Sequence, residues 1–210
     1  MAYDFKREMR GLYQPPRTPG IVDVPSACYV AVDGVGDPNE EGGAYQQALG
    51  LLYGISFTIK MAPKAGVDLP GYFAYVVPPL EGLWSLDGAE GFDPARKADF
   101  AWTSCIRLPG FVTPEVFEWA RGEAQRKKGG DFSAARLMTL AEGRCVQRLY
   151  VGPYDDEPPA IEEMHRFAAE QGLRADITPE RRHHEIYLSD PRRCAPERLK
   201  TVIRLPVAPA

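Results

Sequence analysis

Two distant segments of the chain share one order of residue types, and this internal repeat limits the possible folds more than any other feature. Residues 29–38 and residues 147–158 each run from an apolar stretch into a glycine turn, then an acidic residue, a proline and a helical pattern. Such a repeat predicts a strand-helix-strand-strand unit that is used twice. Joining two such units gives an α+β fold with a curved antiparallel sheet, helices on one face and a ligand cleft on the other.

Each unit contains four predicted elements. Apolar residues at helical spacing predict helices at 41–61 and 158–171. β-branched and aromatic residues predict the strands, which are 27–33, 72–77 and 99–107 in the first unit and 144–151, 184–188 and 200–206 in the second. Prolines and glycines fill residues 78–91, so we predict a loop there that carries Glu81 and Trp84.

We expect the whole chain, residues 1–210, to form a single domain. Four prolines near the N-terminus exclude a continuous helix or a central strand, so the chain should begin with an arm that lies on the domain. Thr113 and Pro114 are typical of a helix start, as N-cap and first helical residue. The predicted parts are the arm, the first repeat, a connecting helix with its linker, and the second repeat, at residues 1–26, 27–110, 111–143 and 144–210.

Charge and composition exclude several classes of protein. The net charge is −4 and the basic residues form only short clusters, whereas a nucleic-acid-binding surface has a concentrated basic stripe. This charge balance favours a neutral or cationic ligand. No apolar run approaches the roughly 18 residues that a membrane span needs, and the charged N-terminus lacks a secretory signal, so we expect a cytoplasmic protein. The four cysteines form no CxxC pair, which predicts reduced thiols.

The predicted strand 184–188 carries the most informative side chains. Because side chains alternate across a strand, Glu185 and Tyr187 share one face, and His184, Ile186 and Leu188 share the other. Ile186 and Leu188 should face the helix-packed core, so Glu185 should point into the cleft. A carboxylate among aromatic rings loses hydration and can hold a cation or a water molecule strongly. The alternative is an exposed glutamate on an open sheet.

Aromatic side chains are expected around Glu185, where they could stack on a flat ligand and attract a cation. They come from both predicted repeats and comprise Phe73, Tyr75, Trp84, Trp102, Tyr154 and Tyr187. Each of them taken alone is more typical of a hydrophobic core than of a ligand site.

We expect neither a metal site nor a cofactor. His183 and His184 are adjacent on a strand, so they face opposite ways and do not bind one metal ion together. The turn at residues 33–38 lacks the third glycine and the spacing of a dinucleotide fingerprint.

Four segments resemble the signature segments of stand-alone GyrI-like proteins in their order and spacing. They are Pro-Leu-Glu-Gly-Leu-Trp at 79–84, Val-Gly-Pro-Tyr-Asp-Asp-Glu-Pro at 151–158, and the stretches 183–193 and 200–207. The resemblance extends over nearly the whole chain. It is closest to a subfamily that hydrolyses the cyclopropane of duocarmycin- or yatakemycin-type alkylating agents by means of an aromatic cage.

This resemblance implies a fold of two repeats with a ligand cleft between them, shared with the effector-binding domains of multidrug-responsive regulators. It also implies a binder of hydrophobic xenobiotics that protects the cell. By position, the pocket glutamate of the family falls on Glu185, with Tyr187 beside it. The loop motif supplies Glu81 and Trp84, and the glycine-proline-tyrosine turn supplies Tyr154. Ser85 stands where many relatives have a second tryptophan, so one wall of the cage differs.

In the hydrolase interpretation, Glu185 positions or deprotonates a water molecule aimed at the strained ring, and a tyrosine hydroxyl donates to the conjugated carbonyl. Two alternatives use the same fold. One is a non-catalytic protein that sequesters small molecules, and the other is a gyrase-directed interaction protein. Direct nucleic-acid binding is not expected, because the two repeats use the whole chain and leave no helix-turn-helix segment.

Overall fold

The computed structural model describes residues 2–86 and 97–210. Within them, nine strands form one antiparallel sheet in the order β1-β6-β9-β8-β3-β4-β2-β5, with β7 paired to β9. The strands are β1 (Gly20–Val24), β2 (Ala27–Val35), β3 (Leu80–Leu86), β4 (Phe100–Arg107), β5 (Arg136–Leu140), β6 (Gly143–Val151), β7 (Leu173–Ala175), β8 (His183–Tyr187) and β9 (Lys200–Pro209). The helices are α1 (Phe5–Glu8), α2 (Arg10–Tyr13), α3 (Ala44–Lys60), α4 (Pro114–Lys128) and α5 (Pro158–Glu170).

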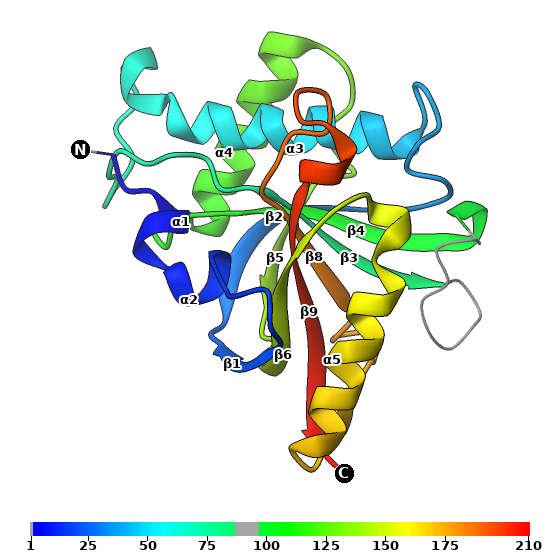
Figure 1. Cartoon of the computed structure of the whole chain (residues 1–210). Coiled ribbons are helices and arrows are strands. Elements are labelled where there is room, and N and C mark those ends of the chain that lie inside the picture. Colours follow the sequence, from blue (N-terminus) through cyan, green and yellow to red (C-terminus); the bar gives the residue numbers. More distant parts are fainter. Residues whose placement is uncertain (1, 87–96) are drawn as a thin grey trace.

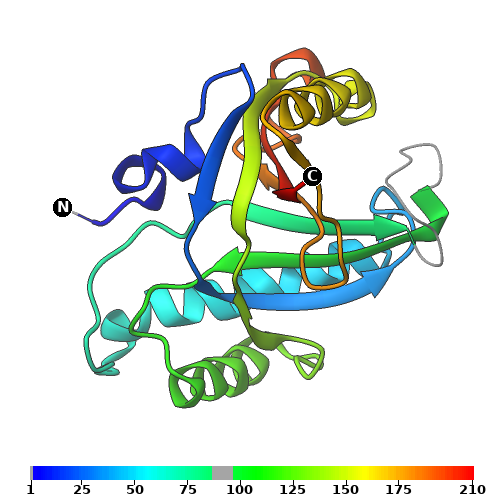
Figure 2. The same ribbon diagram turned by 90° about the horizontal axis from the view of Figure 1, so that it is seen from below.

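The predicted α+β fold with its twice-used unit is confirmed. The first unit is β2-α3-β3-β4 and the second is β6-α5-β8-β9. Their strands lie in the orders β2-β4-β3 and β6-β9-β8, and β3 pairs with β8 where the units meet. The strands of the two units run in clearly different directions in Figure 2, so the joined sheet is curved.

Helices α3 and α5 pack on the same face of the sheet, one on each unit (Figure 1). Leu52, Ile55 and Ile59 of α3 lie in one core with Val30 of β2 and Ile106 of β4. In the second unit, apolar side chains of α5 and of β6 and β9 form a separate core, which contains Met164, Ala168, Val146, Ile203 and Leu205. Complete burial of such a side chain contributes about 1.5–3 kcal/mol, so these two cores fix both helices over the sheet.

Helix α4 begins as the sequence predicts. Thr113 is the N-cap, its hydroxyl accepts a hydrogen bond from the Val116 N–H, and Pro114 is the first helical residue. The helix packs against α3 through apolar side chains that include Phe117 and Ala120.

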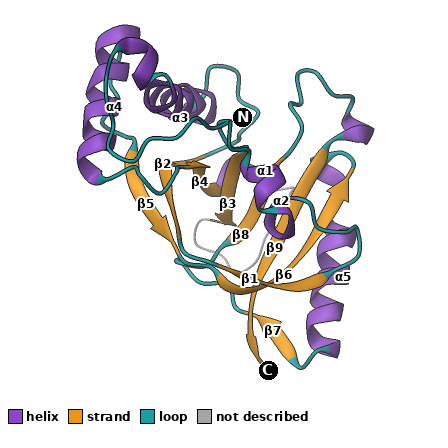
Figure 3. Cartoon of the chain, turned by 90° about the vertical axis from the view of Figure 1, so that its left-hand side faces the viewer, coloured by secondary structure: helices purple, strands orange, loops and turns teal. Residues whose placement is uncertain are grey.

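The opposite face of the sheet is covered by the N-terminal segment (Figure 3). Phe5 of α1 and Leu12 and Tyr13 of α2 share a core with Ile186 of β8 and Val202 of β9. The chain then continues into β1, which pairs with β6 at the edge of the sheet.

Two predicted elements of the first unit are wrong. Residues 72–77 form no strand and make only one isolated bridge, between Tyr75 and Tyr3. The strand lies instead within the predicted loop, as β3, and the rest of that loop, residues 87–91, is outside the described part of the chain. Gly82 explains the error. A Cβ there would lie 2.6 Å from Trp84 Nε1 and 2.9 Å from the Tyr187 hydroxyl, so this glycine permits close packing within a strand rather than a turn.

Among the helices of residues 2–86 and 97–210, none combines the length and the apolar character needed to cross a bilayer.

Candidate functional site

The alternation predicted for β8 is confirmed, but the face assigned to Glu185 is wrong. Glu185 pairs with Gly82 and Tyr187 pairs with Leu80, so both side chains lie on the face that carries α3 and α5. Ile186 lies on the opposite face, in the core that the N-terminal segment supplies. The prediction assumed that only the helix face buries apolar residues, whereas α1 and α2 provide a second apolar layer.

Glu185 lies in a chain of buried polar contacts. Its exposed fraction is 5%, and its carboxylate accepts a hydrogen bond from the Tyr187 hydroxyl at 2.9 Å. The same hydroxyl accepts a hydrogen bond from Trp84 Nε1 at 2.9 Å. Burial and the charge of Glu185 raise the pKa of Tyr187 well above its usual value, so this phenol stays protonated and remains a donor.

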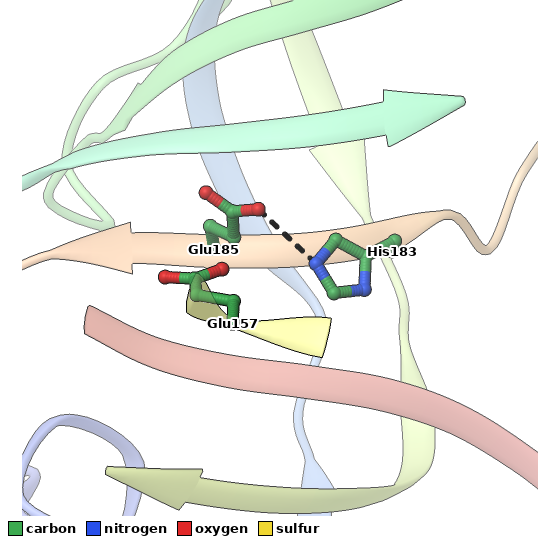
Figure 4. A group of neighbouring side chains, drawn as sticks. All are labelled: Glu157, His183 and Glu185. Atoms are coloured by element: carbon green, nitrogen blue, oxygen red, sulfur yellow. Dashed lines mark hydrogen bonds and ion pairs between the residues drawn. The ribbon is translucent and has the colours of Figure 1, made fainter. Parts of the chain in front are cut away.

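His183 lies on the other side of the Glu185 carboxylate. Its Nε2 is 3.1 Å from Glu185 Oε1, and both side chains are buried (Figure 4). The two residues are two apart on β8, so the alternation that places Glu185 on this face also places His183 there. A carboxylate that holds an imidazole in this way can orient it for proton transfer.

Glu157 brings a second carboxylate to this pair. It occupies the N-cap position of α5 without a side-chain capping hydrogen bond, has an exposed fraction of 1%, and points toward His183 and Glu185 in Figure 4. One ligating atom from each of the three residues lies within 4.8 Å of the other two. Burial raises the pKa of Glu157 well above its usual value, and the charge of Glu185 raises it further. Glu157 is therefore favoured in its neutral, protonated form beside Glu185.

Aromatic rings from both units surround this acidic group. Tyr45 of α3 stacks on Trp84 at a centroid distance of 5.8 Å and meets Trp102 edge-on at 5.1 Å. Tyr154 meets Tyr187 edge-on at 5.6 Å. Burial, together with the charge of Glu185, raises the pKa of Tyr154 to about 12, so this phenol also remains a donor at neutral pH.

The structure brings together five of the eight predicted site residues, namely Trp84, Trp102, Tyr154, Glu185 and Tyr187. The other three lie elsewhere. Tyr75 packs in the core beneath the N-terminal segment, and Phe73, which is 39% exposed, contacts Tyr3 and Tyr75. The prediction that placed Tyr75 and Phe73 beside Glu185 assumed a strand at 72–77, and that strand does not form. A groove of about 580 Å³ is lined by residues 63 and 66–72, and none of the predicted site residues lines it.

Glu81 lies on the other face of the sheet from Trp84, because the two are three residues apart on β3. It is fully buried, 2.9 Å from His184 Nε2 and 3.2 Å from the Tyr13 hydroxyl that donates to it. His184 also contacts Glu142 at 2.8 Å, and Glu142 accepts from Arg204 at 3.1 Å. Burial alone would lower the pKa of His184, but Glu142 and Glu81 raise it to about 9.

Sequence reasoning missed Tyr45 and Glu157 and considered His183 only as a metal ligand. The signal for His183 was available, since it is two residues before Glu185 on the same strand. Glu157 also lies within the internal repeat, directly before Pro158, the proline that starts α5. Nothing in the sequence pattern indicated that the first turn of α3 would place Tyr45 against Trp84.

Two strand-helix-strand-strand units with an acidic, aromatic-walled group between their helices define a class of small-molecule-binding proteins. Residues 17–208 match the GyrI-like small molecule binding domain, and the chain belongs to this family. Comparison with curated proteins finds no match.

The chain is also similar to solved structures. A hydrolase from Listeria innocua is 44% identical with a TM-score of 0.89, over 98% of this chain and 100% of that one. An uncharacterized conserved protein from Listeria innocua is 46% identical with a TM-score of 0.92, over the same shares of the two chains. The EcmrR C-terminal domain is 12% identical with a TM-score of 0.56, over 92% of this chain and 98% of that domain, and shares the fold.

Proposed function

We propose that this protein binds flat, hydrophobic aromatic xenobiotics beside Glu185 and hydrolyses the cyclopropane of duocarmycin- or yatakemycin-type alkylating agents. The observation that carries the proposal is the contact chain from Trp84 through Tyr187 and Glu185 to His183, with aromatic rings beside it. The similarity to a Listeria innocua hydrolase at 44% identity supports an enzymatic role.

The proposed reaction adds one water molecule across a strained carbon–carbon bond. The oxygen of water attacks the methylene carbon of the cyclopropane, and Glu185, oriented by His183 and Tyr187, accepts the proton. The ring bond breaks and its electron pair moves into the conjugated carbonyl, which becomes a phenolate. Aromatic stacking holds the ligand in the attack geometry.

Tyr154 is the candidate donor to the developing phenolate. The hydroxyl of Tyr187 already donates to Glu185, whereas Tyr154 lies beside it with its proton retained. A donor placed where negative charge develops stabilises the transition state more than the ground state. Tyr154 passes its proton to the phenolate and regains one from solvent, while Glu185 releases to solvent the proton it took from water. The product leaves as a phenol with a new hydroxyl group.

The proposal is tested by turnover of a duocarmycin-type cyclopropanoid in excess over the full-chain protein, in water enriched in ¹⁸O. We expect many equivalents of ring-opened product per chain, each with one ¹⁸O atom. Glu185→Gln should abolish turnover and keep ligand binding, while Glu162→Gln, an exposed change on α5, should match the wild type. Wild-type rates in Glu185→Gln would remove this residue from the mechanism.

A sequestering protein would use the same rings and carboxylate without chemistry. Tight binding of the cyclopropanoid with at most one equivalent of product per chain would establish that function instead.

A further inference from the structure

The three buried side chains Glu157, His183 and Glu185 form a group that the proposed hydrolysis does not fully use. They come from two separate elements, the start of α5 and the strand β8, and they point toward one another (Figure 4). Their exposed fractions are 1%, 4% and 5%. An imidazole and two carboxylates that converge away from solvent are a typical set of metal-binding groups.

The electrostatics of the group point to a missing positive charge. The carboxylates of Glu157 and Glu185 are both buried, and each places an oxygen within 4.8 Å of the other. Glu157 Oε1 is buried without a hydrogen-bond partner among the described residues, although the Thr201 hydroxyl is close enough to lower the pKa of Glu157. A buried carboxylate oxygen in this position is unfavourable unless a proton or a cation reaches it.

We propose that Glu157, His183 and Glu185 bind a divalent transition-metal ion, with Zn²⁺ as the ion that fits best. Tetrahedral zinc with bonds of about 2.0 Å separates its ligand atoms by roughly 3.3 Å. The 3.1 Å between His183 Nε2 and Glu185 Oε1 matches that separation. Three protein ligands leave a fourth position for water or a small ligand, and the ion neutralises the two carboxylates.

The expectation of no metal site did not take into account that His183 and Glu185 share one face of the strand. His183 and His184 do face opposite ways, since His184 lies in the buried group with Glu81 and Glu142. The proposed ligands are instead two residues apart on one strand, with the third supplied from the other side by α5. The opposite orientation of His183 and His184 therefore does not exclude the proposed metal site.

A proton on Glu157 is the competing explanation for the same geometry. The two explanations predict different behaviour, because a metal ion must displace the proton that the neutral carboxyl carries. Zinc binding at neutral pH should then release about one proton per ion. A site that accommodates only a shared proton should show no uptake of zinc.

The test is a calorimetric titration of the chelator-treated full chain with ZnCl₂ at pH 7, in two buffers of different ionisation enthalpy. We expect one ion per chain and a heat that differs between the buffers by the proton released. Glu157→Gln and His183→Gln should each weaken binding by about 100-fold or more. Asp156→Asn is a matched control, because this residue is exposed and directly precedes Glu157, and the variant should bind as the wild type does.

No uptake of zinc, or uptake that the Glu157 and His183 substitutions leave unchanged, would overturn the proposal. Far-ultraviolet circular dichroism checks that each variant is folded, and Glu185→Gln replaces any that is not. Because zinc is the only probe, the result does not depend on the proposed hydrolysis. That reaction is measured separately in the presence of a chelator, so the two proposals can fail independently.

Discussion

At the scale of single residues, Tyr187 joins an indole to a carboxylate through one hydroxyl group. Tyr187→Phe removes the acceptor for Trp84 Nε1 and the donor to Glu185 together. A buried polar group left without its partner costs about 1–3 kcal/mol, so we expect the free energy of unfolding to fall by at least that amount. Urea denaturation measures the change, with Tyr3→Phe on the N-terminal segment as the control. An unchanged midpoint would mean that water replaces both contacts.

A second single residue, Tyr154, tests the proposed chemistry rather than stability. Tyr154→Phe keeps the ring that meets Tyr187 and removes only the hydroxyl. If that hydroxyl donates to the developing phenolate, kcat should fall by about 10²-fold while the ligand Kd changes little. Steady-state turnover and a direct binding titration separate the two effects. A parallel loss of affinity and kcat would indicate that the hydroxyl serves ligand binding instead.

At the scale of elements, β3 depends on a glycine that brings two strands together. Gly82→Ala would place a methyl group 2.6 Å from Trp84 Nε1 and 2.9 Å from the Tyr187 hydroxyl. Overpacking of this kind costs about 1–3 kcal/mol, and it should also displace the tyrosine from Glu185. Gly20→Ala in β1 is the matched control, because its Cβ meets nothing within 4 Å. Thermal unfolding of both variants should show a lower melting temperature for Gly82→Ala than for Gly20→Ala. Equal melting temperatures would contradict the prediction.

The strand β3 is one of the elements that could not be predicted from the sequence. Apolar spacing, helix start signals and β-branched or aromatic content identify α3, α4, α5 and the strands β2, β4, β6, β8 and β9. Gly82 interrupts the apolar alternation of β3. Residues 72–77 have the aromatic and β-branched content of a strand but form an irregular segment. The strands β1, β5 and β7 were also not predicted. The first two lie at the edges of the sheet, and β7 has only three residues.

At the scale of the whole molecule, the sequence correctly indicates a repeated unit but not how much of the sheet is covered. The N-terminal segment was predicted as an arm, and its apolar residues gave no sign of which face they would meet. The choice of face for Glu185 depended on that contact. The group around Glu185 was therefore predictable in part, through strand alternation and Trp84, whereas Tyr45 and Glu157 required the packing of two helices on one face.

The buried ionic network beneath the N-terminal segment joins parts that are distant in the sequence. Arg204 of β9 donates to the Leu12 carbonyl at 2.7 Å and to Glu142 at 3.1 Å, and Tyr13 donates to Glu81. Burial alone would raise the pKa of Glu142, but His184 and Arg204 lower it to about 2. Removal of one partner from such a buried pair leaves an uncompensated charge and is strongly destabilising.

The network should therefore make the folded state sensitive to acid. Because the pKa of Glu142 is lower in the folded chain than in the unfolded chain, its ionised form stabilises the fold above about pH 4.5, and this contribution is lost as the pH falls toward 2. A shift of this size corresponds to about 3 kcal/mol. Urea denaturation at a series of pH values should show the loss. Asp33→Asn removes a half-exposed carboxylate whose pKa is also lowered, and it should retain most of the slope because solvent screens its pairing with Arg136. A free energy of unfolding that stays constant from pH 5 to about pH 3 would show that the pKa of Glu142 is not lowered in the native protein.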